Sequence, residues 1–295
     1  MLNKRGILLC SLLALAFSGK DAFASRYANG IEGIKAASVP GPGLYFKMYN
    51  YAYNANTLTD DNGDELDIGF EVDTYAISNR LIWVSDKKIL GGNYFADFVI
   101  PIVSVDIEID ASQVSDNESG IGDIYLEPLG IAWHGKQHDT AVALGVFLDN
   151  ADFDADEAAS IGAGYVTYMI TGGGTYYFDE EKKWSGSLLA RYEIHTEQDE
   201  TDITRGDEFH FEFGVGYNVG SNTDVGVSGY FNTQVESDSG PGADSNKDRV
   251  FAIGPEVSKF FASHNWLVSF RTLKEFKAEN APEGVTSTLT LTKIF

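Results

Sequence analysis

Hydrolytic chemistry would need a serine, a histidine and an acid brought together by the fold. The chain has five histidines that could take part, which are His134, His138, His195, His210 and His264. Neither a His-x-Ser nor a Gly-x-Ser-x-Gly motif accompanies them. We therefore expect no catalytic residues and no enzyme activity.

Metal chemistry would need carboxylates at a fixed spacing. The stretch Asp152-Phe-Asp154-Ala-Asp156 begins like a calcium loop, because aspartates alternate along it. It then departs, since Glu157 stands at the turn-glycine position and Ala163 at the position of the closing glutamate. We therefore predict no metal site, and no motif for a cofactor is present either.

A third candidate is a row of tyrosines near the start of the chain. Tyr45, Lys47, Tyr49, Tyr51 and Tyr53 alternate with apolar residues that include Leu44, Phe46 and Met48. A period of two predicts a β-strand with two different faces. A tyrosine face offers an apolar wall with hydroxyls, which can hold an oriented aromatic molecule or water. Alternatively, the tyrosines pack an interior or form an outer girdle.

The same alternation continues to the C-terminus. We predict twelve strands, at residues 43–55, 69–85, 93–108, 121–134, 140–148, 161–178, 184–195, 207–219, 223–235, 248–262, 266–277 and 285–295. The connections alternate between short turns and mostly longer loops. An even number of antiparallel strands joined in this way predicts an all-β fold, a 12-stranded antiparallel transmembrane β-barrel of the bacterial outer membrane. A soluble β-sandwich is the alternative, and it predicts no such alternation of loop lengths.

Aromatic residues and charges agree with the barrel. The four tryptophans, Trp83, Trp133, Trp184 and Trp266, stand at strand ends beside short turns, where an aromatic girdle would meet the membrane interface. Lysines occupy the short turns, and the longer loops hold most of the acid. The last residue, Phe295, ends an amphipathic strand as in the signal read by the barrel assembly machinery, although Lys293 departs from the usual pattern.

Composition divides the chain and excludes some partners. Residues 1–24 have the charged start, apolar run and small-residue cleavage site of a signal peptide, and they contain the single cysteine, Cys10. Residues 25–42 are rich in Gly and Pro and form either a periplasmic leader or a plug of the lumen, and residues 43–295 form the barrel. The net charge of −23 argues against nucleic-acid binding. The acidic loops would be solvated, or bridged by divalent cations to lipopolysaccharide.

Strand phase also predicts which charged residues face the lumen. These are Arg80, Asp97, Asp123, Glu127, Arg191, Glu193, His210, Glu212, Glu256, Arg271 and Glu275. Charges of both signs in a narrow lumen would pair, because an unpaired charge is unfavourable where water is scarce. The set can act as a salt-bridge network that braces the wall, as a constriction that selects solutes, or as both.

Several segments resemble a family of predicted outer-membrane transporters linked to the meta-pathway of phenol degradation. The similarity lies in residues 32–45, in Gly122-Asp123-Ile-Tyr-Leu-Glu-Pro128, in Val250-Phe-Ala-Ile-Gly254-Pro255-Glu256 and in 274–280. The resemblance implies a barrel that passes small hydrophobic or aromatic compounds across the outer membrane. A structural or adhesive surface barrel is the alternative. The oligomeric state is left open.

Overall fold

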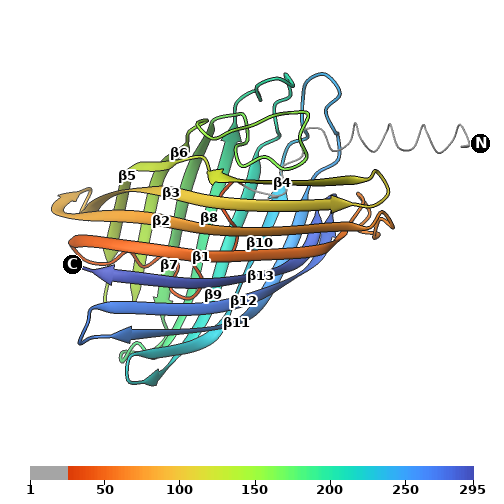
Figure 1. Cartoon of the computed structure of the whole chain (residues 1–295). Helices are drawn as coiled ribbons and strands as arrows, with labels where there is room; N and C mark the ends of the chain where they lie inside the picture. Colours follow the sequence, from red (N-terminus) through yellow and green to blue (C-terminus); the bar gives the residue numbers. More distant parts are fainter. Residues whose placement is uncertain (1–25) are drawn as a thin grey trace, which may run out of the picture.

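The computed structural model describes residues 26–295, so the predicted signal peptide and Cys10 lie outside the described residues. The described chain forms one antiparallel sheet of thirteen strands (Figure 1). The strands are β1 (Gly43–Leu58), β2 (Phe70–Ile89), β3 (Gly92–Ile109), β4 (Val114–Ile121), β5 (Tyr125–His134), β6 (His138–Phe147), β7 (Thr167–Tyr177), β8 (Trp184–His195), β9 (Glu208–Gly220), β10 (Thr223–Gln234), β11 (Arg249–Phe261), β12 (Trp266–Glu279) and β13 (Pro282–Ile294).

The sheet closes on itself. β1 pairs with β2 on one side and with β13 on the other, in a register that sets Tyr45 opposite Ile294. β4 pairs with β3 over Ile102–Ile109, whereas β5 pairs with β3 over Asn93–Val99. Because β4 and β5 share one position beside β3, the wall is a closed barrel of twelve strands, and the predicted fold class is confirmed.

The fourth strand differs from the prediction. We predicted a loop at 109–120 and a strand at 121–134, but residues 114–121 form β4 and the chain leaves the sheet at residues 122–124 before β5. The sequence hides β4 because Ser115, Asn117 and Ser119 occupy its exposed positions, so no apolar face marks the strand. The predicted loop at 278–284 is also shorter, since only residues 280 and 281 separate β12 from β13.

The sixth predicted strand begins later than expected. We predicted it from residue 161, but β7 begins at Thr167. Carboxylates of the barrel wall bind the backbone before that point, since Glu118 accepts the N–H of Ile161 at 2.9 Å and Asp123 accepts that of Ala163 at 3.1 Å. These bonds hold residues 161–163 in a loop over the lumen instead of in the sheet.

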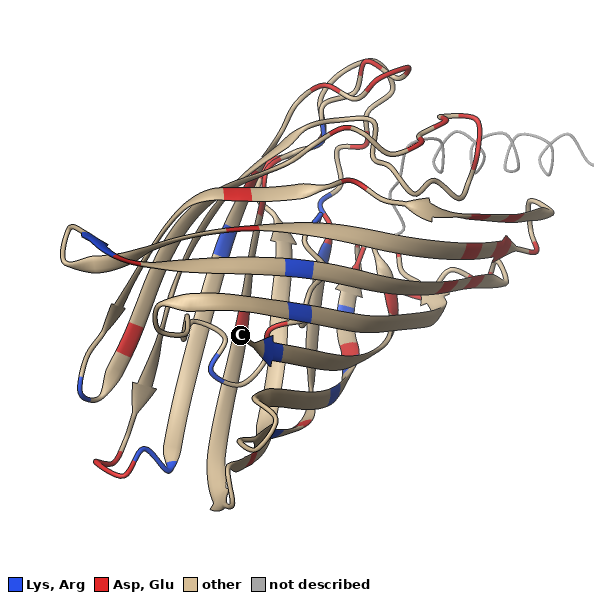
Figure 2. Cartoon of the chain, turned by 60° about the vertical axis from the view of Figure 1, so that its left-hand side comes forward, with Lys and Arg blue, Asp and Glu red and all other residues tan. Residues whose placement is uncertain are grey.

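The two ends of the barrel differ. The long loops gather at one end, and the C-terminus lies with the short turns at the other (Figure 1). Acidic residues concentrate on the long loops, whereas lysines mark several short turns (Figure 2). Trp83 and Trp184 are about half exposed near the short turns, as a lipid-facing girdle requires.

Among residues 26–295, no helix is long and apolar enough to cross a membrane.

Candidate functional site

Side chains of β1 alternate between the two faces of the wall. Tyr45, Tyr49, Tyr51 and Tyr53 are all buried, with at most 7% of any of them exposed, whereas Leu44 is 39% exposed. The predicted phase therefore places the tyrosines inside the barrel. There Tyr45 donates to the carbonyl of Gly41 at 2.7 Å and Tyr49 donates to Glu32, so the N-terminal segment before β1 lies within the lumen.

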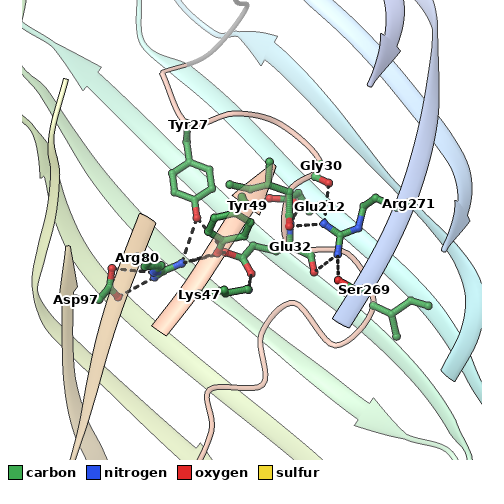
Figure 3. Close-up of polar contacts among 12 residues, drawn as sticks. Tyr27, Gly30, Glu32, Lys47, Tyr49, Arg80, Asp97, Glu212, Ser269 and Arg271 are labelled. Carbon is green, nitrogen blue, oxygen red and sulfur yellow. Dashed lines mark hydrogen bonds and ion pairs between the residues drawn. The ribbon is translucent and has the colours of Figure 1, made fainter. Parts of the chain in front are cut away.

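Glu32 is the centre of these contacts (Figure 3). Its carboxylate accepts hydrogen bonds from the Tyr49 hydroxyl at 2.6 Å, from Arg80 Nη1 at 2.9 Å and from the Tyr27 hydroxyl at 3.0 Å. Lys47 Nζ forms a further ion pair with it. Burial by itself would raise the pKa of Glu32, but the neighbouring cations outweigh burial and lower it well below its ordinary value. The segment is thus held by an ionised carboxylate among donors from β1 and β2.

Arg80, on β2, joins Glu32 to the two next strands of the same wall. Its Nε and Nη2 donate to the two carboxylate oxygens of Asp97 at 2.8 and 2.7 Å, a bidentate pair between β2 and β3. Nη2 also lies 3.3 Å from Glu127 Oε1 on β5. One guanidinium therefore serves three carboxylates, from the lumen segment and from two neighbouring strands.

Arg271 binds the same segment from β12. Its guanidinium donates to the carbonyls of Gly30 at 3.3 Å, of Ile31 and of Glu32 at 3.2 Å, and it pairs with Glu256 at 3.0 Å (Figure 3). Carbonyls without a helix or sheet partner need such a donor when they are buried. Arg271 therefore supplies the hydrogen bonds that let an irregular segment lie inside the barrel.

Gly33 permits the close approach of the segment to this wall. Its φ is +69°, and a Cβ at this position would lie 2.1 Å from a carboxylate oxygen of Glu256 and 2.6 Å from Arg271 Nε. The next residue, Ile34, donates its N–H to Glu256 Oε2 at 2.9 Å. Only glycine meets both the left-handed backbone and the lack of space.

A second wall contact comes from β8 and β9. The N–H of Glu32 donates to Glu212 Oε2 at 2.8 Å, and Arg191 Nη1 donates to Glu212 Oε1 at 2.7 Å. The Arg191 guanidinium also lies 3.8 Å from the centre of the Tyr27 ring. Tyr27 is therefore held both through its hydroxyl and through its ring face.

Glu193 and Asp123 hold the beginning of the segment. Glu193 accepts the N–H groups of Arg26 at 3.1 Å and of Tyr27 at 3.2 Å, and His210 Nε2 lies 3.1 Å from its Oε1. The Arg26 side chain forms an ion pair with Asp123 at the break between β4 and β5. The segment is thus attached to the wall on several sides.

Two cavities remain beside the segment. The larger, of about 390 Å³, lies toward the short-turn end, where Tyr45, Phe95 and Ile294 form part of its wall. The smaller, of about 140 Å³, lies toward the long-loop end, where Tyr51, Val103 and Ile161 border it. The exposed surface of both is mainly apolar, and the charge network around Glu32 borders the larger one.

The structure places all the predicted lumen residues inside the wall, and most of the charged ones are in ion pairs. The pairs already described cover every charged member except Glu275. Glu275 instead accepts hydrogen bonds from the Tyr53 hydroxyl at 2.8 Å, from the Gly284 N–H at 2.7 Å and from the Tyr230 hydroxyl. That these residues line a route for solutes stays a prediction.

Sequence reasoning missed the partners on the segment itself, above all Arg26, Tyr27 and Glu32. A signal was present, because Glu32 is the only acid in residues 25–42 and Arg26 and Lys35 are the only bases. Lys35 pairs with Asp224 at 2.8 Å. Isolated charges in a Gly- and Pro-rich stretch can therefore indicate partners on a surrounding wall.

The contacts of the histidines in residues 26–295 differ from a serine–histidine–acid relay. His134 Nδ1 lies 3.1 Å from Asp139, but the Ser38 hydroxyl donates to Asp139 and not to the histidine. His195 Nδ1 lies 2.9 Å from the Thr167 hydroxyl, and His210 contacts Glu193. His264 lies 2.8 Å from the adjacent Ser263 hydroxyl in an exposed turn, without an acid to orient it. Within residues 26–295 there is no group of three or more His, Cys, Asp or Glu side chains suited to a metal ion.

Comparison with known proteins identifies a family and a fold. The sequence profile of the family described as "Putative MetA-pathway of phenol degradation" matches residues 55–291. No curated protein sequence matches the chain. An outer membrane channel from Pseudomonas putida F1 aligns with 88% of this chain and 97% of its own, at 15% identity and a TM-score of 0.78. The translocator domain of the autotransporter NalP from Neisseria meningitidis aligns with 88% of this chain and 91% of its own, at 9% identity and a TM-score of 0.51. Both are named for transport and not for catalysis.

Proposed function

The chain belongs to the family of the putative MetA-pathway of phenol degradation, and on that premise we propose that it is an outer-membrane channel for small hydrophobic compounds, aromatic ones included. Passage is passive and involves no catalysis, metal or cofactor. Export through the signal peptide and the barrel assembly machinery brings the chain to the outer membrane. Its membrane partners there are lipid and lipopolysaccharide.

One observation carries the proposal, which is that the charges of the lumen are paired with each other while most of the surface of the remaining space is apolar. Ions and sugars need unpaired polar groups and continuous water along their path. Here Glu32 and its neighbours occupy the centre, and cavities of about 390 and 140 Å³ with mainly apolar walls lie on either side. Apolar walls favour solutes that lose little hydration free energy when they leave water.

Solute uptake by whole cells tests the proposal, because the lipopolysaccharide layer slows hydrophobic solutes that cross a plain lipid bilayer unaided. A Gram-negative host that produces the chain is expected to take up radiolabelled toluene and phenol several times faster than the same host without it. Uptake of a labelled sugar should be equal in the two. If aromatic uptake is equal while the chain is folded in the outer membrane, the channel proposal is wrong.

The C-terminal residue gives a separate prediction about assembly. The N–H of Phe295 donates to the carbonyl of Leu44 at 3.1 Å, but its side chain is 70% exposed and so contributes little to the packing of the finished barrel. Deleting Phe295 is expected to lower the amount of folded protein in the outer membrane several-fold, whereas the melting temperature of what does assemble should hardly change. Quantitative immunoblots of membrane fractions measure the first effect. Normal levels without Phe295 would count against its role as an assembly signal.

A further inference from the structure

We propose that the smaller cavity is a binding site for a single uncharged aromatic ring of the phenol class, with the Tyr51 hydroxyl as the polar partner of the solute. The inference rests on the proposed function, because it names the solute that one part of the channel holds. The cavity lies between β1, β2 and β3, the lumen segment and the loop at residues 160–162.

The size of the cavity fits one ring. Its volume is about 140 Å³. An apolar cavity of about 150 Å³ engineered into an unrelated protein binds benzene, which sets the scale for a single six-membered ring. A long alkyl chain or a fused ring system would not fit without movement of the walls.

The walls suit an aromatic ring in particular. The rings of Tyr27 and Tyr125 meet edge to face at a centroid distance of 5.9 Å, and those of Tyr125 and Phe147 lie 4.6 Å apart. Val99, which lies beside Tyr125 on the neighbouring strand, and Val103 add aliphatic surface to the border of the cavity. A ring bound against Tyr27, Tyr125 and Phe147 can make edge and face contacts, which stabilise aromatic pairs beyond the burial of their surface.

The hydroxyls of Tyr51 and Ser78 on the border of the cavity are available to a solute, and that of Tyr51 stands on a ring. Tyr27 and Tyr49 donate to Glu32, and Tyr125 donates to Glu127 at 2.7 Å. The Tyr51 side chain is only 5% exposed and borders the same cavity, yet within residues 26–295 its hydroxyl has no hydrogen-bond partner. The Tyr51 hydroxyl is therefore open to a solute in the cavity, and the hydroxyl of a phenol can form a hydrogen bond with it.

Charge in the cavity favours a neutral solute. The charged groups on its border, Arg26 and Asp123, form an ion pair with each other. Asp123 also accepts the N–H groups of Asn150 at 2.9 Å and of Ala151 at 2.8 Å. A carboxylate solute such as benzoate would have to bring its charge into the cavity without a new counter-charge, so phenol and toluene should be preferred to it.

Access is from the long-loop end, where a loop and not a strand closes the cavity. Gly122 lies at the break between β4 and β5, and a Cβ there would lie 3.1 Å from Val103 and 3.5 Å from the carbonyl of Ile161. Ile161, Gly162 and Ala163 are held by one backbone hydrogen bond each, to Glu118, to the carbonyl of Asp152 and to Asp123, and by no strand ladder. A loop held in this way can move aside at a smaller free-energy change than a paired strand.

Fluorine NMR titrations of the full mature chain in detergent test the site, with 4-fluorophenol, 4-fluorotoluene and 4-fluorobenzoate as probes. The unmodified chain is expected to bind the first two saturably and the third much more weakly. Tyr51→Phe should weaken binding of 4-fluorophenol about three- to tenfold, the range of one hydrogen bond, and leave that of 4-fluorotoluene unchanged. Ala76→Phe fills the cavity and should abolish saturable binding of both, because Ala76 lies on its border.

Matched controls come from the outward face of β2. Tyr75 is 48% exposed and lies beside Ala76, so Tyr75→Phe removes a hydroxyl and Ile77→Phe adds a ring on the lipid side of the wall. Both controls should bind the probes like the unmodified chain. Retention of the folded form on unheated gels shows whether each variant still forms the barrel, and the milder Ala76→Leu replaces Ala76→Phe if that variant does not fold.

The outcomes separate this inference from the channel proposal. The proposed binding site is wrong if the unmodified chain shows no saturable binding. It is also wrong if a folded Ala76→Phe variant binds the probes as the unmodified chain does. If cells producing the chain nevertheless take up toluene faster, the channel proposal stands. If ring binding is found but uptake is not increased, the site stands and the channel proposal fails.

Discussion

Deletion of residues 26–39 from the mature chain is expected to raise ionic conductance in planar bilayers on the order of tenfold, from a low and unsteady level to a steady open state. The segment fills the middle of the lumen and contributes Glu32, whose carboxylate accepts hydrogen bonds from Tyr49 and Arg80 and whose N–H donates to Glu212 across the lumen. Its removal leaves Lys47, Arg80 and Arg271 facing a wider and wetter space. Permeating ions can then interact with these charged side chains, which are now paired with the segment.

A point substitution provides the graded counterpart of this deletion. Glu32→Ala keeps the length of the segment but removes its central carboxylate, so we expect brief openings instead of a permanent pore. Asp61→Ala, in the exposed loop between β1 and β2, serves as the control of equal charge change. If the deletion variant conducts no better than the intact chain although it is folded, the segment does not limit the passage of ions.

Substitution of Arg80 by alanine should produce the largest loss of stability, with the free energy of unfolding lowered by about 3–5 kcal/mol. Arg80 makes a bidentate pair with Asp97 and contacts Glu32 and Glu127, and its side chain is 12% exposed. The variant leaves three carboxylates without their shared cation. Their repulsion weakens both the β2–β3 wall and the attachment of the segment.

Urea unfolding followed by tryptophan fluorescence measures this effect in detergent or in lipid vesicles. Lys88→Ala is the matched control, because Lys88 lies on the same strand but in its exposed end beside the turn. The control should unfold at the same urea concentration as the unmodified chain. Equal midpoints for Arg80→Ala and Lys88→Ala would show that Arg80 has no greater structural role than a surface lysine.

The sequence determined the class of fold and the face of each strand. Phase has a simple physical basis, because successive side chains of a strand point to opposite sides and a barrel wall has only a lipid side and a lumen side. Tyr45 and Arg191 could therefore be assigned to the interior from their neighbours alone. The same argument failed for β4, whose exposed positions are polar and give no contrast between faces.

The tertiary structure alone decided what the interior charges bind and where residues 26–42 lie. Glycine and proline suit a linker and a plug equally, because both lack regular hydrogen bonding, so composition could not distinguish the two. Arg271 and Glu212 stabilise the segment inside the lumen by bonding to its backbone, and these partners lie up to 241 residues away in the chain. A sequence gives the charge and the hydrogen-bonding capacity of each group. Which remote groups come within bonding distance is decided only when the barrel closes.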